Sequence, residues 1–209
     1  MAGLDNNQQY YLNKPKVMQA PNKNSNIIEK IHISDQQKNN TLKILHLNIH
    51  GLSHKIDELV IPLLPNPPLI LCLSEHHLKL DEIMNTNLDM YTLVAQFCRQ
   101  TFKQGGVCIY VLNNLQFNSI NLDKFNREKD MEICALTLSL SACSAILICI
   151  YRSPIGNFNF FLKQLKSILN KNFKLSADII LCGDFLTLTI WMTLPRKNYI
   201  LIQSLLPLV

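Results

Sequence analysis

Four polar side chains that could carry out chemistry stand at the ends of mainly apolar runs: Asn48, Glu75, Tyr151 and Asp184. A carboxylate fixed at the end of a buried strand is well placed to bind Mg²⁺, which prefers one or two carboxylates with water and phosphate oxygens. A second carboxylate can orient or deprotonate an attacking water. An amide and a phenol can hydrogen-bond phosphate oxygens. These residue types together point to chemistry on a phosphate ester.

Each residue taken singly also has an ordinary structural interpretation. Glu75 could be a solvated loop acid, and Asn48, close to a glycine, could simply form a turn. Tyr151 and the neighbouring Arg152 could lie at an apolar boundary with the arginine stem covering it. The combination of all of them, each at the end of an expected strand, favours the functional interpretation, because α/β folds place their sites at such ends.

Five short motifs contain these residues, and their order along the chain is informative. They are Asn48-Ile49-His50-Gly51-Leu52, Leu73-Ser74-Glu75, Gly105-Gly106-Val107, Tyr151-Arg152-Ser153-Pro154 and Gly183-Asp184-Phe185. In this order they resemble the endonuclease/exonuclease/phosphatase superfamily, and most closely the endonuclease domain of non-LTR (LINE-type) retrotransposons. The resemblance covers about residues 42–185, so we expect a C-terminally truncated form of that domain.

The resemblance implies a role for each matched residue. Glu75 would be the main ligand of Mg²⁺, with Mn²⁺ as the alternative, and Asn48 would contact both the metal shell and a phosphate oxygen. Asp184 would position the attacking water, while Tyr151 and Arg152 would contact phosphate. The implied partner is DNA, and no small-molecule cofactor is expected.

The chain departs from the family pattern after Phe185. The family continues with an asparagine that contacts the scissile phosphate, but here the residue is Leu186, and no Asp-His pair follows. Back-translation of residues 186–193, anchored on the single codons of Trp191 and Met192, gives Asn-Ile-Asp-Tyr-Leu-Asp-Asp in another frame. We therefore interpret residues 186–209 as an out-of-frame or non-native tail, and we expect an impaired or inactive enzyme.

Two further features lie near these motifs. We interpret Gly105-Gly106 as turn geometry. His76 and His77 follow Glu75 directly, but neighbouring residues of an extended chain face opposite sides, so both would not bind one ion easily. We interpret them as rim residues with a DNA contact.

Composition limits the class of protein. With 209 residues, 48% hydrophobic and 17% charged, the chain can form one globular domain with a sizeable core. The net charge of +5 is compatible with a polyanionic partner without demonstrating one. The seven cysteines form no C-x-x-C pair, which indicates a reducing compartment and makes a zinc site improbable. We expect an intracellular protein, nuclear if functional, without signal peptide or transmembrane segment.

Apolar periodicity predicts the elements. Strands are expected over 42–48, 69–73, 91–97, 107–112, 134–140, 145–151 and 177–184, and helices over 55–64 and 158–169. Residues 1–40 are rich in Asn, Gln and Lys and predict a disordered leader with one frayed helical turn near 27–33. The fold class is α/β: an incomplete four-layer sandwich of two mixed sheets flanked by helices, with its last strands missing, over residues 41–185.

The function expected from these observations is a metal-dependent phosphodiester hydrolase, a DNA-nicking endonuclease of retrotransposon origin. Two alternatives stay open. One is an abasic-site nuclease or phosphatase of the same superfamily. The other is a non-catalytic remnant that binds DNA through its basic charge.

Overall fold

The predicted strands assemble into two mixed β-sheets in the computed structural model. It describes residues 28–32, 41–64, 66–113, 115–139, 144–171, 178–184 and 199–202. The first sheet holds, in spatial order, β1 (Ile28–His32), β2 (Thr41–Asn48), β3 (Ile70–Ser74), β5 (Val107–Leu112) and β4 (Tyr91–Phe97). The second holds β10 (Tyr199–Ile202), β9 (Asp178–Asp184), β8 (Ser144–Tyr151), β7 (Glu132–Ser139) and β6 (Phe117–Ile120).

The two sheets pack face to face because their strands are apolar on both sides. In β3, Ile70 and Cys72 point into the core between the sheets, whereas Leu71 and Leu73 point to the outer face. Strand β8 alternates in the same way: its odd-numbered residues 145–151 enter the core between the sheets and its even-numbered residues 146–150 face outward. Such strands need a cover on both faces, which helices provide.

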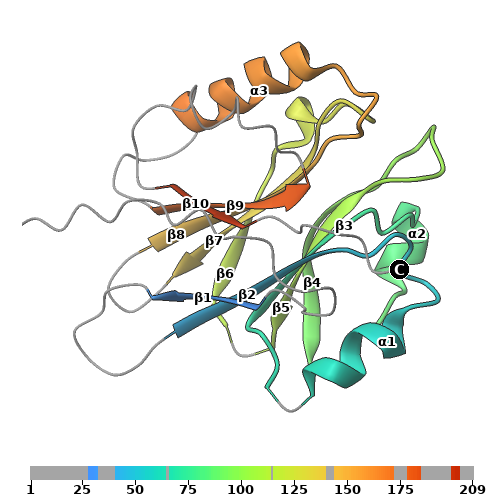
Figure 1. The fold of residues 1–209 in the computed structure, drawn as a ribbon, viewed down its shortest axis with the longest axis vertical. Helices are drawn as coiled ribbons and strands as arrows, with labels where there is room; N and C mark the ends of the chain where they lie inside the picture. Colours follow the sequence, from blue (N-terminus) through green and yellow to red (C-terminus); the bar gives the residue numbers. More distant parts are fainter. Residues whose placement is uncertain are drawn as a thin grey trace, which may run out of the picture.

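Helices cover both outer faces and complete four layers (Figure 1). α1 (Ile56–Val60), η1 (Ile61–Leu63) and α2 (Leu80–Met84) pack on the first sheet. α3 (Phe158–Lys171) packs on the second sheet, and η2 (Asp123–Phe125) adds Phe125 to the same cluster. The buried residues Phe161, Leu165, Ile168 and Leu169 recur at helical spacing, which gives α3 its single apolar face.

The expected two-sheet α/β sandwich is confirmed, with differences in the elements. β6, α2, η2 and β10 were not predicted, and the predicted helical turn near 27–33 is wrong. Residues 28–32 instead form β1, antiparallel to β2. The physical reason is that the edge of β2 offers unpaired backbone groups that an added strand satisfies.

The predicted leader and tail fall mostly outside the described residues. In the leader only β1 is described, and in the tail only β10, which pairs in parallel with β9. The frameshift interpretation of residues 186–209 stays a prediction. In the described part of the chain, no helix has the length and apolarity needed to cross a membrane.

Candidate active site

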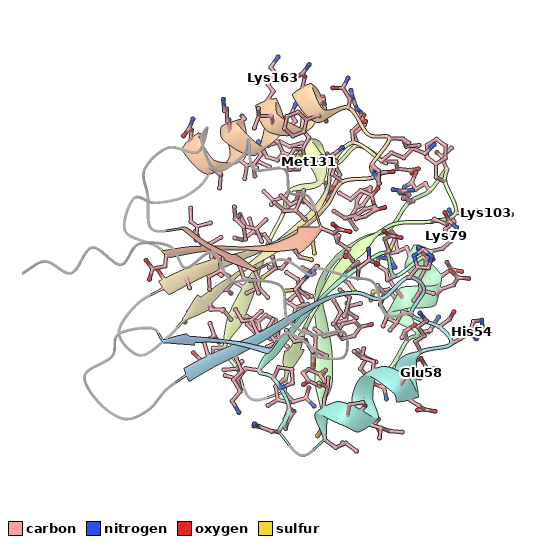
Figure 2. All side chains as sticks on the ribbon, in the orientation of Figure 1. His54, Glu58, Lys79, Lys103, Met131 and Lys163 are labelled. Atoms are coloured by element: carbon pink, nitrogen blue, oxygen red, sulfur yellow. The ribbon has the colours of Figure 1, made fainter. Side chains whose placement is uncertain are left out.

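Two parallel strand pairs, one in each sheet, deliver the four predicted residues to the same edge of the sandwich. In the first sheet Asn48 of β2 lies opposite Ser74 of β3, one residue before Glu75. In the second sheet Tyr151 of β8 lies opposite Asp184 of β9. The loops at this edge carry the labelled His54, Lys79 and Lys103 (Figure 2). Parallel pairing thus brings together side chains that are far apart in the sequence.

Asn48 joins the two sheets at this edge. Its Nδ2 donates to Glu75 Oε1 at 2.9 Å and to Asp184 Oδ2 at 3.1 Å, while its Oδ1 accepts the His50 backbone N–H at 3.3 Å. The side chain is buried, so these bonds fix its orientation. Asn48 therefore holds two carboxylates at a set separation, a positioning role that the sequence did not predict.

Glu75 is the centre of the site. Four side chains hydrogen-bond its carboxylate: Asn48, His50, His77 and Tyr151. Burial alone would raise the pKa of Glu75, but these hydrogen bonds, that of His77 foremost, outweigh burial and lower the pKa to about 2. The carboxylate is therefore ionised at neutral pH, as a metal ligand must be.

Tyr151 reaches Glu75 from the opposite sheet. Burial and the nearby Glu75 charge raise the pKa of Tyr151 well above its usual value. The phenol is therefore protonated at neutral pH and donates its hydrogen bond to Glu75. The Arg99 guanidinium lies 5.8 Å from the centre of the Tyr151 ring, within the range of a cation–π contact.

The loop that carries Glu75 is held on both sides by backbone hydrogen bonds. On one side Gly51 N donates to Glu75 O at 2.8 Å. On the other, Glu75 N donates to Gly106 O and His77 N donates to Gly105 O, both at 2.8 Å. The glycine pair was interpreted as turn geometry; it has left-handed φ angles of 111° and 90°, and it also anchors the Glu75 loop.

Three residues that are not glycine share a left-handed backbone here: His50 (φ 48°), Glu75 (φ 55°) and His77 (φ 61°). This conformation costs about 1 kcal/mol or more for each such residue, and it persists where the surroundings enforce it, often at functional sites. The backbone hydrogen bonds to Gly51 and to the glycine pair supply that enforcement.

His50 was not predicted as a member of the site, and His77, interpreted from the sequence as a rim residue with a DNA contact, also lies against Glu75. The Nδ1 of His50 lies 3.0 Å and the Nε2 of His77 lies 3.3 Å from Glu75 Oε2. The interpretation of His76 as a rim residue is wrong, because its ring is wholly buried, with Nε2 3.1 Å from the Phe97 carbonyl oxygen. The two neighbouring histidines thus face different sides, as expected. The i, i+2 spacing of Glu75 and His77 was the signal for a shared face.

Arg99 and Glu132 form a second buried polar group beside the site, also missed. Glu132 accepts hydrogen bonds from Arg99 Nε and Gly106 N, both at 2.6 Å. The Gly106 carbonyl oxygen in turn accepts the backbone N–H of Glu75. The Arg99–Glu132 pair therefore helps to hold the loop that carries Glu75.

Arg152 was predicted to contact phosphate. Its Nη1 donates to the carbonyl oxygens of Ser153 at 3.1 Å and Gly156 at 3.3 Å, so it braces its own loop. Its contact with phosphate stays a prediction.

Comparisons with known proteins give similarity at the level of structure. No family model matches the sequence, and no curated protein matches it. The structure is similar to the endonuclease domain of TRAS1, a telomere-specific non-LTR retrotransposon, with a TM-score of 0.50 and 17% identity. That match covers 68% of this chain and 57% of the TRAS1 chain.

The structure is also similar to TDP2 of D. rerio, solved in complex with a single-strand DNA product. The TM-score is 0.52 and the identity 17%, over 71% of this chain and 62% of the TDP2 chain. The chain thus spans less than two thirds of the length of either protein. These similarities, together with the two-sheet sandwich, show that the chain shares its fold with the TRAS1 endonuclease domain and with TDP2.

Proposed function

We propose that this edge of the sandwich is the centre of a divalent-metal-dependent phosphodiester hydrolase that acts on DNA. The observation that carries the proposal is the cross-sheet cluster of Asn48, Glu75, Tyr151 and Asp184. An ionised carboxylate, a second carboxylate fixed by a shared amide, and a protonated phenol are the groups that in-line attack on a phosphodiester needs.

Each group has a proposed task. Glu75 holds Mg²⁺ or Mn²⁺, because oxygen ligands suit both cations. A metal bound there supplies Lewis-acid stabilisation and a template for in-line displacement. Asp184 orients and deprotonates the attacking water, and Asn48 keeps Asp184 beside Glu75. When substrate binds, the Tyr151 hydroxyl turns its one hydrogen from Glu75 to a phosphate oxygen as negative charge develops there. Arg152 contacts a neighbouring phosphate.

The finer assignment is a nicking endonuclease of retrotransposon origin, active in the nucleus. It is supported by the Tyr151-Arg152-Ser153-Pro154 and Gly105-Gly106-Val107 motifs and by the similarity of fold to the TRAS1 endonuclease domain. An abasic-site nuclease or a phosphatase would use the same centre on another substrate. Comparing plasmid, abasic duplex and phosphomonoester substrates distinguishes these.

Nicking of supercoiled plasmid with Mg²⁺ or Mn²⁺ tests the proposal. We expect a rate near background for the chain as it stands, because Leu186 cannot donate a hydrogen bond to the scissile phosphate. We expect Leu186→Asn to raise the rate, and Glu75→Gln or Asp184→Asn in that background to remove it. Glu58→Gln, an exposed acid on α1, is the matched control and should leave the rate unchanged.

A second candidate function is a non-catalytic DNA-binding remnant, favoured by Leu186 and the net charge of +5. DNA binding with a steep salt dependence, but no nicking by the Leu186→Asn variant, would support the remnant and contradict the enzyme. Robust nicking by the unmodified chain would instead show that Leu186 does not impair it.

A further inference from the structure

Two imidazoles face the carboxylate that is the proposed metal ligand. His50 Nδ1 and His77 Nε2 both point at Glu75 Oε2. These three ligand atoms lie within 4.8 Å of one another, the only such group of three in the described part of the chain. Imidazole is a ligand that suits Zn²⁺, Cu²⁺, Fe²⁺ and Ni²⁺, whereas Mg²⁺ prefers oxygen ligands and keeps its waters.

The separations between these atoms fit coordination around one small cation. Glu75 Oε2 lies 3.0 Å from His50 Nδ1 and 3.3 Å from His77 Nε2. With metal–ligand bonds of about 2.1 Å, neighbouring ligands of one cation are about 3.0 Å apart in an octahedral and about 3.4 Å apart in a tetrahedral arrangement. Rotation of the two rings would turn their nitrogen lone pairs from Glu75 Oε2 towards a cation shared with that oxygen.

The three side chains differ in the fraction that is exposed to solvent, and the difference shows which side of the group is open. His50 is 58% exposed, while His77 and Glu75 are 18% and 14% exposed. A cation held by them would therefore keep an open side towards solvent, which is where water or a phosphate oxygen could bind. Catalytic metal sites have such an open position, and structural sites do not.

The backbone supports the same grouping independently. The three residues that share this face all have left-handed, non-glycine backbone. Backbone hydrogen bonds from Gly51 to Glu75 and from His77 to Gly105 fix these conformations. Strained backbone that brings three ligand-type side chains onto one point is a pattern found at functional sites.

We propose that His50, Glu75 and His77 form a two-histidine, one-carboxylate face that binds a transition-metal cation more tightly than Mg²⁺. The inference rests on the proposed function, since it assigns the metal class of that centre. The affinity should follow the order Zn²⁺ above Co²⁺ above Mn²⁺, with Mg²⁺ weakest, because imidazole nitrogens contribute two of the three protein ligands.

Metal binding to the full chain tests this without any measurement of cleavage. Calorimetric titration with Zn²⁺ and Mg²⁺, and visible absorption of the Co²⁺ complex, report affinity and nitrogen ligation. We expect His50→Asn and His77→Asn each to weaken Zn²⁺ binding at least about tenfold and to change the Co²⁺ spectrum. Asparagine tolerates left-handed backbone, so neither variant adds strain. His54→Asn, an exposed histidine of the same loop, is the matched control and should bind like the parent.

The outcomes separate the two proposals. Unchanged Zn²⁺ affinity in both histidine variants, with circular dichroism confirming that they fold, overturns this inference even if Mg²⁺-dependent nicking is found. Zn²⁺ affinity that depends on both histidines establishes the site even if no metal supports nicking, in which case only the proposed hydrolase fails. Mg²⁺ binding as tight as Zn²⁺ binding also overturns the inference.

Discussion

The guanidinium of Arg99 and the carboxylate of Glu132 form an ion pair from which solvent is almost excluded, with 7% and 0% of the two side chains exposed. Glu132 also accepts hydrogen bonds from the backbone N–H groups of Gly106 and Lys129, so both of its carboxylate oxygens have hydrogen-bond partners. Arg99 also lies near the Tyr151 ring and near the charge of Glu128, but Glu132 is the carboxylate that it contacts directly. Glu132 is therefore the residue on which the pair depends.

Replacing Glu132 with Gln should destabilise the protein by about 3–5 kcal/mol, because it removes the carboxylate that directly contacts the buried Arg99 charge. Urea denaturation followed by circular dichroism measures the change. Glu58→Gln, an exposed acid on α1, should change the free energy of unfolding by less than about 0.5 kcal/mol. Similar small effects for both variants would contradict the assigned role of Glu132.

Gly106→Ala should be strongly destabilising for two reasons. The residue has φ 90°, and an added Cβ would overlap the His76 ring. Gly51→Ala shares only the first reason: its φ is 99°, but its Cβ would lie 3.5 Å from His77 Nδ1, an ordinary contact. We therefore expect Gly106→Ala to cost at least about 1 kcal/mol more than Gly51→Ala in thermal or urea unfolding. Equal costs would mean that the His76 ring moves aside freely.

His76 should make stability fall on mild acidification. Burial lowers its pKa to about 4, and Nδ1 accepts the Leu78 N–H at 3.0 Å. Between its unfolded pKa of about 6.5 and its folded pKa of about 4, the unfolded chain binds a proton that the folded chain does not. The free energy of unfolding should therefore drop by up to about 3 kcal/mol from this residue as the pH falls through that window.

Burial also lowers the pKa of His46, which adds to the loss with the same sign. His76→Gln should therefore reduce the pH dependence without abolishing it, as measured by urea unfolding at several pH values. The exposed His54→Gln should leave the slope unchanged. An unchanged slope in His76→Gln would show that His76 titrates normally.

Tyr151→Phe and Tyr91→Phe form a matched pair of buried hydroxyl deletions. Tyr151 donates to the Glu75 carboxylate, whereas Tyr91 donates to the Pro68 carbonyl oxygen at 2.8 Å. Hydrogen bonds to charged acceptors contribute about 1.5–3 kcal/mol, and those to neutral acceptors about 1 kcal/mol. Tyr151→Phe should therefore lower the free energy of unfolding more than Tyr91→Phe at neutral pH. The reverse order would show that Tyr151 contributes little to holding Glu75.

Asn48→Asp should make the apo protein depend on a cation. The new carboxylate would face both Glu75 and Asp184, which the amide now joins. Three like charges repel without a counter-ion, so the melting temperature should fall, and a divalent cation should restore it more than in the parent. Asn118→Asp, on exposed β6, is the control. No metal-dependent recovery would argue against cation binding at this edge.

The sequence predicted much of the fold because the strands are short apolar runs that end in recognisable turn residues. It also predicted that Glu75 and Asp184 would meet, since both follow buried strands whose carboxyl ends share one edge. Strand β6 was not predicted because its face is half polar, and only its pairing with β7 makes it a strand.

Contacts between residues that are distant in the sequence could not be predicted. Arg99 and Glu132 are 33 residues apart and belong to no periodic pattern. His50 reaches Glu75 only because a left-handed turn redirects the chain after β2. The periodicity of apolar residues does not predict such turns. Which loop residues come into contact depends on how the two sheets pack.

The hydrogen bond between Asn48 and Asp184 joins residues separated by 136 positions in the chain. Closing so long a loop costs entropy that is recovered only when the two sheets dock. The edge that carries Asn48 and Asp184 should therefore form late in folding, after each sheet has its own pairings. A cation that binds there would slow unfolding without accelerating folding. It would therefore increase the kinetic stability of the native state.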